Sequence, residues 1–119
     1  QPEWAELTLT FSGFWEVQPH WLADNLDVAQ ILDVREEDEF NGNLGHIAGS
    51  IPIALGHLKK RINELDKQRP TVTICRAGGR SAQATVILRK AGFNKVANLA
   101  GGMLHWRAQQ YPVDGGECK

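Results

Sequence analysis

Hydrophobic and polar residues follow two different patterns along this chain. Short β-branched or apolar runs, of which residues 71–74 are the clearest, have the length and composition of buried strands. Between them, apolar residues recur every three or four positions, as at Leu58, Ile62 and Leu65, which is typical of an amphipathic helix. The pattern predicts strands at residues 15–17, 30–34, 51–54, 71–74 and 95–99, and helices at residues 19–26, near residue 40, and at residues 58–65, 82–91 and 103–110.

Residues that favour helix ends support these boundaries. Pro19 suits the first turn of a helix, Ser81 is a good N-cap, and Gly92 is the residue type that commonly follows a helix. The alternation of strands and helices predicts an α/β fold, with a mostly parallel sheet of about five strands flanked by helices. Ligands bind such sheets beyond the carboxyl ends of the strands, and Cys75 lies at one of these ends.

The length of the chain, 119 residues, fits one compact domain with a single core. We expect residues 1–13 to be a lead-in with an extended piece at residues 7–11, and residues 14–113 to form the domain. Residues 114–119 are expected to be a loose tail, with the chain loosening from residue 111. The first residue is Gln1 rather than methionine, so we expect a trimmed or processed chain or a piece of something longer, which leaves open the loss of a targeting segment.

Charge and hydropathy narrow the classes of partner. The formal net charge is -1, which gives no overall attraction to nucleic acid or to an anionic membrane. No apolar run approaches the ~20 residues that span a bilayer, and no signal-peptide pattern opens the chain. We therefore expect a cytoplasmic monomer with neither a nucleic-acid partner nor a membrane partner.

The two cysteines, Cys75 and Cys118, lie far apart in different sequence contexts. They do not make a disulfide framework, so we expect a reducing compartment and a free reactive thiol. The four histidines are scattered and form no ligand-like spacing with a cysteine, so no metal site is expected. Cys118 has two interpretations: an exposed thiol on a frayed tail, or a second thiol that receives sulfur or forms a disulfide with Cys75.

Residues 75–81 have the composition of an anion-binding loop between a strand and a helix. Main-chain N–H groups in such a loop turn inward, and the start of the helix adds further unpaired N–H groups. Gly78 and Gly79 can adopt the positive φ that the loop needs, and Arg76 and Arg80 add positive charge. Such surroundings lower the pKa of a cysteine from about 8.5 to roughly 3.5–7.5, so we interpret the thiol as a nucleophile rather than a structural cysteine.

Four segments of the chain resemble the rhodanese sulfurtransferases. The order Cys75-Arg76-Ala77-Gly78-Gly79-Arg80 is similar to the Cys-x-x-Gly-x-Arg active-site loop of that family. The other segments follow the order of the family: Leu32-Asp33-Val34-Arg35, Gly45-His46-Ile47-Ala48-Gly49-Ser50-Ile51 and Asn98-Leu99-Ala100-Gly101-Gly102-Met103. The resemblance covers about residues 14–113 and implies a three-layer rhodanese-like fold.

The same resemblance implies a sulfurtransferase that needs no cofactor. Cys75 would take sulfane sulfur from thiosulfate or a related donor, hold it as a persulfide, and pass it to cyanide, sulfite or a thiol. The partners would be these small molecules, or a thiol protein in a sulfur relay. The substrate-binding loop would comprise Arg76, Ala77, Gly78, Gly79, Arg80 and Ser81.

Several charged residues near these segments have a functional and a structural interpretation. Arg80 would orient the donor and the loop, or else pair with a nearby acid, and Arg76 would favour anion entry, or else be solvated. We expect Asp33 and Arg35 to brace the loop through charge-assisted hydrogen bonds, and His46 to orient the main chain of a Gly-rich turn rather than act as a base.

Three alternative functions are open. Phosphatases and arsenate reductases share a Cys-loop-Arg anion site, but their loops are similar to a pattern with five residues between Cys and Arg, and this chain has four. A rhodanese-like interaction module without turnover is the second alternative. The third is a rhodanese-like module of a larger persulfide-processing protein.

Overall fold

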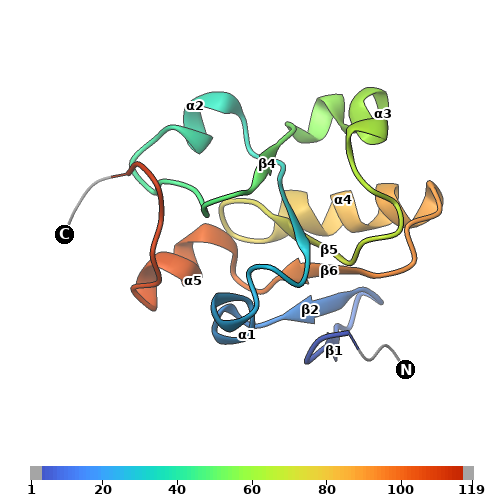
Figure 1. Ribbon diagram of the computed structural model, residues 1–119, viewed down its shortest axis with the longest axis horizontal. Coiled ribbons are helices and arrows are strands. Elements are labelled where there is room, and N and C mark those ends of the chain that lie inside the picture. Colours follow the sequence, from blue (N-terminus) through green and yellow to red (C-terminus); the bar gives the residue numbers. More distant parts are fainter. Residues whose placement is uncertain (1–3, 117–119) are drawn as a thin grey trace.

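The computed structural model describes residues 4–116, which form one sheet with helices on both faces (Figure 1). The strand order is β1-β2-β6-β5-β3-β4, and every neighbouring pair is parallel except β1 and β2. The strands are β1 (Thr8–Leu9), β2 (Trp15–Val17), β3 (Gln30–Asp33), β4 (Ile51–Pro52), β5 (Thr71–Ile74) and β6 (Val96–Leu99). The helices are α1 (Pro19–Asp24), α2 (Glu37–Phe40), α3 (Leu58–Arg61), α4 (Gly79–Lys90) and α5 (Gly102–Ala108), with 3-10 turns η1 (Leu55–His57) and η2 (Ile62–Glu64).

The sheet is the middle of three layers, as the α/β prediction requires. Successive residues of a strand point to opposite faces, so each central strand contributes to two cores. Ile31, Val72 and Ala97 pack in the core that includes residues of α1 and α5. Leu32 and Val96 pack in the core that includes residues of α3 and α4. Every residue of β3, β5 and β6 is buried, which explains their near-continuous apolar and β-branched composition.

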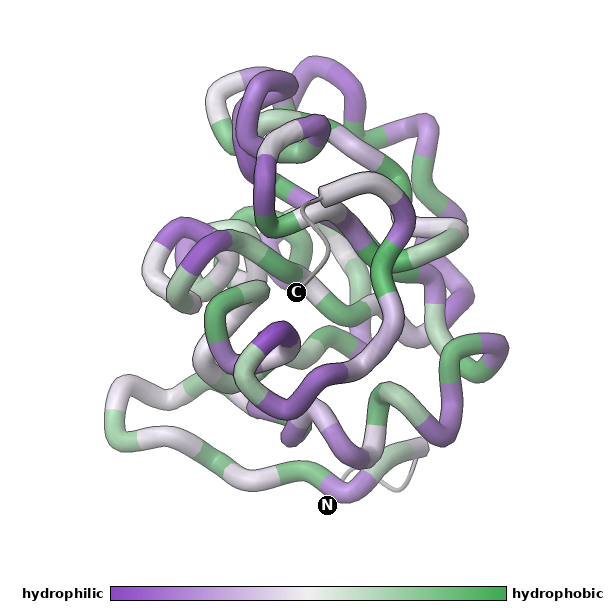
Figure 2. Tube along the Cα trace, turned by 90° about the vertical axis from the view of Figure 1, so that its left-hand side faces the viewer, coloured by the Kyte–Doolittle hydropathy of each residue, from purple (hydrophilic) through white to green (hydrophobic). Residues whose placement is uncertain are grey.

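Strand β5 lies at the centre, hydrogen-bonded to β6 on one side and β3 on the other. The starts of α4 and α5 lie at the end of the sheet toward which the parallel strands point, and Cys75 follows the last residue of β5 there (Figure 1). Figure 2 looks onto this end and shows the segment after α5 running across the front of the molecule. The topology thus places Cys75 where the start of a helix can meet it.

Helix α4 begins three residues earlier than the sequence predicted. The expected cap was Ser81, but the N-cap is Gly78, which has a φ of 117°. This left-handed conformation lets the chain turn directly from the loop into the helix, a turn that a residue with a Cβ would resist. Arg80 and Ser81 therefore belong to the first turn of α4 rather than to the loop or its cap.

Two other elements differ from expectation. The sheet has six strands rather than about five, because the exposed pair of residues in β1 adds antiparallel to β2. The predicted helix at residues 58–65 is divided into α3 and the 3-10 turn η2, and η1 precedes it, although Leu58 and Leu65 are buried as its apolar face required. No helix within residues 4–116 has the length and apolar composition needed to cross a bilayer.

The described part of the C-terminal segment is held against the domain, although we expected it to be loose. The main chains of His46 and Asp114 exchange two hydrogen bonds, of 3.0 and 2.8 Å. The indole N–H of Trp106 donates to the carbonyl of Pro112 at 3.0 Å. These bonds tie the segment to the turn before β4 and to α5. Cys118 lies outside the described residues.

Candidate active site

Cys75 is held at the end of β5 by its own main chain. Its carbonyl accepts a 2.9 Å hydrogen bond from the N–H of Met103, and the carbonyl of Arg76 accepts a 3.0 Å bond from the N–H of Leu104. These two donors are in the first turn of α5, where N–H groups have no partner within the helix. The approach depends on Gly102, because a Cβ there would lie 2.5 Å from the carbonyl oxygen of Cys75. The start of α5 therefore fixes the position from which the thiol projects.

The sulfur of Cys75 is surrounded by hydrogen-bond donors. The N–H of Gly78 lies 3.0 Å from Sγ, and the hydroxyl of Ser81 lies 3.3 Å from it. Burial raises the pKa of the Cys75 thiol, but the Ser81 hydroxyl and the N–H groups of Ser81, Gly78 and Ala77 lower it, and the net shift is downward. The thiol is 1% exposed, so these donors replace the water that would otherwise solvate a thiolate.

Only one of the two glycines in the predicted loop needs a positive φ. Gly78 has a φ of 117°, which directs its N–H toward Sγ. Gly79 is the first residue of α4, does not have a positive φ, and has open space where a Cβ would stand. Glycine is therefore required by the backbone conformation at position 78 but not at position 79, although both glycines fit the sequence pattern equally well.

A buried polar pair behind the loop was missed in the sequence analysis. The hydroxyl of Ser81 lies 2.5 Å from Oδ1 of Asn98, and Nδ2 of Asn98 donates to the carbonyl of Gly78 at 3.1 Å. Thr73 adds a hydrogen bond from its hydroxyl to the carbonyl of Ser81, at 2.9 Å. Asn98 is 2% exposed and stands in an otherwise apolar strand, which is the signal that could have identified it, because a buried polar residue needs a partner.

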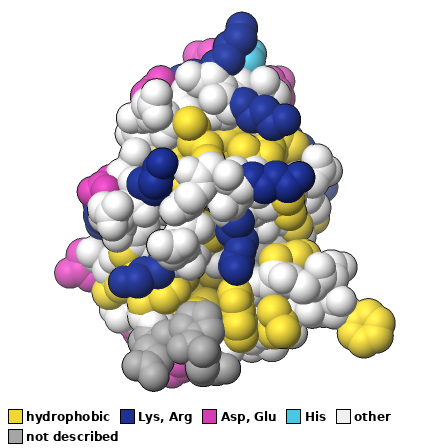
Figure 3. Space-filling model, turned by 90° about the vertical axis from the view of Figure 1, so that its right-hand side faces the viewer, with side chains coloured by type: hydrophobic (Ala, Val, Ile, Leu, Met, Phe, Trp, Pro, Cys, Tyr) yellow, Lys and Arg dark blue, Asp and Glu magenta, His cyan; other side chains and the backbone are white. Residues whose placement is uncertain are grey.

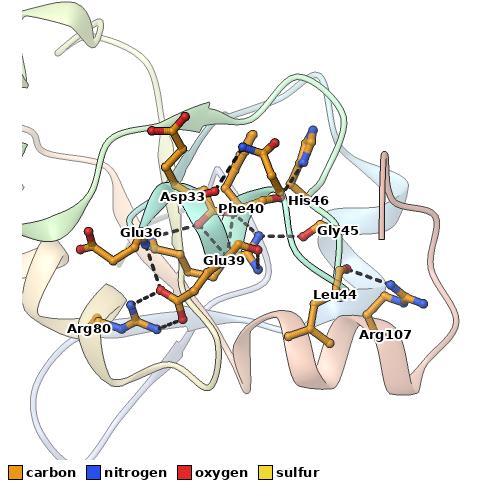
Figure 4. A network of polar contacts seen from close by, with 12 residues as sticks. Asp33, Glu36, Glu39, Phe40, Leu44, Gly45, His46, Arg80 and Arg107 are labelled. Atoms are coloured by element: carbon orange, nitrogen blue, oxygen red, sulfur yellow. Dashed lines mark hydrogen bonds and ion pairs between the residues drawn. The ribbon is translucent and has the colours of Figure 1, made fainter. Parts of the chain in front are cut away.

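Arg80 is engaged by an acid. Its Nη1 and Nη2 donate to the two carboxylate oxygens of Glu39, at 2.6 and 2.8 Å (Figure 4). The hydrogen bond to Arg80 is the main reason why the pKa of Glu39 falls to about 2. The same contact raises the pKa of Arg80. The ion pair weighed as the alternative for Arg80 is the arrangement that the structure shows.

Asp33 and Arg35 form a buried ion pair that braces α2 and the following turn. Nη2 of Arg35 lies 2.8 Å from Oδ2 of Asp33, and both side chains are 1% exposed. The guanidinium also donates to the carbonyls of Glu39, at 3.1 Å, and Gly45, at 2.8 Å. Glu39 in turn binds Arg80. The ion pair of Asp33 and Arg35 therefore supports the start of α4 indirectly, through α2, and not by a hydrogen bond to the cysteine loop.

His46 lies in the same brace. Its Nδ1 is 3.0 Å from the carbonyl of Phe40, and its ring stacks on that of Phe40 with a centroid separation of 3.8 Å. Nearby, Arg107 donates to the carbonyl of Leu44 at 2.9 Å (Figure 4). Through these contacts the imidazole helps to hold the Gly-rich turn between α2 and β4 in place.

Arg76 extends into solvent at the edge of a cleft of about 220 Å³. The cleft is lined by Arg35, Asp38, Glu39, Gly42, Asn43, Leu44 and Arg76. The positive charge of Arg76 thus lies across this cleft from the acidic residues Asp38 and Glu39 of α2. Within residues 4–116, no group of three or more His, Cys, Asp or Glu side chains is arranged to hold a metal ion.

Comparison with known proteins agrees with this architecture. Residues 18–109 match the sequence model of the Rhodanese-like domain. The chain is similar to the thiosulfate sulfurtransferase GlpE of Pseudomonas aeruginosa, with 35% identity over 88% of this chain and 91% of that protein. It is also similar to the putative sulfur carrier protein YrkF of Bacillus subtilis, with 41% identity over 70% of this chain and 44% of that protein.

A solved structure, that of a rhodanese-related protein from Thermoplasma volcanium, superposes with a TM-score of 0.75 and 32% identity over 82% of this chain and 94% of that one. The chain covers 60% of the length of one Bacillus subtilis relative, YqhL, and 44% of the length of YrkF. The superposition confirms the rhodanese-like fold, and the family match covers most of the described sheet and helices. The chain therefore belongs to the rhodanese-like family, several of whose members are sulfurtransferases.

Proposed function

We propose that this protein transfers sulfane sulfur through a persulfide on Cys75. The observation that carries the proposal is the pair of donors at Sγ: the Gly78 N–H at 3.0 Å and the Ser81 hydroxyl at 3.3 Å. Donors in this position stabilise the thiolate, which is the nucleophilic form of cysteine. The similarity to a thiosulfate sulfurtransferase supports thiosulfate as the first donor to test.

In the first step, the Cys75 thiolate attacks the outer sulfur of thiosulfate. A bond forms between Sγ and that sulfur, the sulfur–sulfur bond of thiosulfate breaks, and sulfite leaves with the electron pair. The terminal sulfur of the persulfide is then an anion, which the inward N–H groups of the loop stabilise as they stabilise the thiolate. The same main-chain N–H groups would thus stabilise both the thiolate and the persulfide anion.

In the second step, a nucleophile attacks the terminal sulfur. The bond between the two sulfurs breaks, its electron pair returns to Sγ, and the thiolate is regenerated. Cyanide would yield thiocyanate, sulfite would yield thiosulfate, and a thiolate would yield a new persulfide. Neither step needs a proton transfer to a separate base. We therefore assign His46 no part in the chemistry, and its ring instead stacks on Phe40.

We assign supporting roles to the surrounding charges. Arg76, at the open cleft, attracts an anionic donor. Arg80 acts by anchoring the first turn of α4 through Glu39, and Asp33 and Arg35 hold α2 in place for that contact. The acceptor is a small molecule or a thiol of a relay protein, as the similarity to a sulfur carrier suggests. A reducing compartment such as the cytoplasm keeps Cys75 a free thiol.

The experiment that tests the proposal compares two reactions in the same preparation. We expect the protein to form thiocyanate from thiosulfate and cyanide, and expect Cys75→Ser to abolish this activity. We expect negligible hydrolysis of an aryl phosphate by either form. A Cys75-dependent phosphatase activity without sulfur transfer would contradict the proposal, and Cys118→Ser serves as the control that retains sulfur transfer.

A further inference from the structure

The surface formed by α3 and α4 contains an apolar cleft between basic side chains (Figure 3). The cleft encloses about 280 Å³, and we call it the α3–α4 groove. Its lining comprises Lys59, Ile62, Val86, Ile87, Lys90 and Ala91. Val86 is 49% exposed in this position, so an apolar side chain of the groove remains available for contact.

The groove lies in the basic part of a chain whose charges are unevenly distributed. Residues 59–95 contain ten of the thirteen Lys and Arg residues but only two of the fourteen Asp and Glu residues. Within residues 4–116, no ion pair involves the basic residues of α3 and the last turn of α4 other than Arg61, namely Lys59, Lys60, Arg89 and Lys90. The groove therefore combines an apolar floor with cations that are not neutralised by the described chain.

The groove is separate from the site around Cys75. Helix α4 begins beside the sulfur at Gly79 and ends at Lys90, and at 1.5 Å per residue these ends are about 16 Å apart. The groove residues of α4 occupy its second half. A molecule bound there would leave the loop at residues 75–78 open to donors and acceptors.

We propose that the α3–α4 groove binds an acidic amphipathic helix of a partner protein. In this mode, apolar side chains three or four residues apart enter the floor, while Asp and Glu beside them face the basic rim. The volume is below the usual range for small-molecule sites, about 300–1,000 Å³, and suits side-chain anchors better than a whole ligand.

Two other anionic partners fit less well. Single-stranded nucleic acid is usually bound by aromatic side chains that stack on bases, and none of the described residues that line this groove is aromatic. Membrane surfaces are usually bound by an apolar face that protrudes into the lipid, whereas these apolar side chains line a recess. The concave shape and the positive rim together favour a helix.

Binding of designed peptides to the full chain tests this proposal. The probe is a fluorescein-labelled acidic helix of about 18 residues, with leucines on one face and glutamates beside them. Two matched peptides carry the same composition with the leucines spread around the helix, or lysine in place of glutamate. We expect the first peptide to bind in anisotropy titrations, more weakly as salt rises, and the matched peptides to bind at least about tenfold more weakly.

Variants of the protein locate the binding site. Val86→Asp should weaken binding at least about tenfold, and K59E/K90E should weaken it by a similar factor, while both retain thiocyanate formation. Val28→Asp, which alters another exposed apolar residue, is the control and should bind normally. Far-ultraviolet circular dichroism checks that each variant is folded.

Four results would overturn the proposal. The first is that the peptide with scattered leucines binds as tightly as the amphipathic peptide, and the second is that neither peptide binds at millimolar concentration. The third is that single-stranded DNA or phosphatidylserine vesicles bind more tightly than the peptide at the same salt concentration. The fourth is that the protein self-associates and that Val86→Asp abolishes this self-association without changing peptide binding. The proposal does not depend on the sulfur chemistry, so its failure would leave the assignment of Cys75 unchanged.

Discussion

At the scale of single residues, the hydroxyl of Ser81 has more acceptors than it has protons. It lies 2.5 Å from Oδ1 of Asn98 and 3.3 Å from Sγ of Cys75, and a hydroxyl carries one donor hydrogen. When the sulfur is protonated, the hydroxyl can donate to Asn98 and accept from the thiol. When the sulfur is a thiolate, donation to the sulfur competes with donation to Asn98. Ser81 and Asn98 therefore act on the pKa of the thiol in opposite directions: the hydroxyl stabilises the thiolate, and Asn98 competes for that hydroxyl.

Replacing Ser81 with alanine should raise the pKa of Cys75. The hydroxyl donates to the charged form of the sulfur and lowers its pKa, so removal of the hydroxyl should shift the pKa of the thiol upward. The pH dependence of alkylation by iodoacetamide in a Cys118→Ser background measures this value. Thr85→Ala is the matched control, since it removes a buried hydroxyl one turn further along α4 that donates to the carbonyl of Ala82. An unchanged pKa in Ser81→Ala would contradict the role given to the hydroxyl.

Replacing Asn98 with leucine should lower the pKa of Cys75. The change removes the nearest acceptor of the Ser81 hydroxyl, Oδ1, and leaves the thiolate and the carbonyl of Gly78, each at 3.3 Å, as its acceptors. Donation to the charged sulfur is then favoured, because the carbonyl of Gly78 keeps its bond from the N–H of Ala82. The same alkylation profile measures the shift. In a Ser81→Ala background the downward shift should disappear, and its persistence there would show that Asn98 acts by another route.

At the scale of elements, the loop depends on contacts that join separate helices and strands. Gly78 shapes the turn into α4, the first turn of α5 holds the carbonyls of Cys75 and Arg76, and α2 supplies the partner of Arg80. The sequence pattern predicted α4 and its loop because both are local. It could not predict Glu39 as the partner of Arg80, because the two residues are 41 positions apart and four acids in residues 36–39 are equivalent in the pattern.

The two glycines of the loop should respond differently to alanine. Gly78→Ala places a Cβ on a residue with a φ of 117°, so we expect it to lose about 1–2 kcal/mol of stability or to turn the N–H away from the sulfur. Gly79→Ala adds a methyl group in open space at the first residue of α4 and should retain activity. Urea unfolding and thiocyanate formation measure both effects, and equal loss in the two variants would argue against the observed loop geometry.

The bond between Glu39 and Arg80 should make stability depend on pH. Glu39 has its pKa lowered to about 2, so its contribution is complete above the pKa of the unfolded chain, near 4.5, and is lost as the pH falls toward 2. Allowing for solvent screening, Glu39→Gln should cost on the order of 1–2 kcal/mol at pH 7.

Urea unfolding of both proteins at pH 7 and at about pH 2.5 checks this prediction, and the difference between them should shrink at the lower pH. Glu64→Gln is the control, because Glu64 pairs with Arg61 on the surface and its change should have little effect. A difference that stays constant with pH would show that the carboxylate charge is not responsible.

At the scale of the whole molecule, the alternation of strands and helices was sufficient to predict a mostly parallel sheet with flanking helices and the place of Cys75, and the family resemblance implied the three layers. The extended piece predicted at residues 7–11 contains β1, but the prediction did not place it in the sheet, because its two residues are exposed and carry no periodic signal. It also placed the C-terminal segment too loosely, because the bonds of His46 with Asp114 join positions 68 residues apart in an irregular turn. Pairings between distant, irregular segments leave no periodic pattern in the sequence.

The most direct measurement is the intact mass of the reduced protein before and after incubation with thiosulfate, followed by peptide mapping. The hydrogen-bonded thiolate predicts the gain of one sulfur atom, located on Cys75, absent in Cys75→Ala and reversed by cyanide. An unchanged mass, or a sulfur atom located on Cys118 alone, would contradict the claim that the loop before α4 prepares Cys75 to carry sulfur.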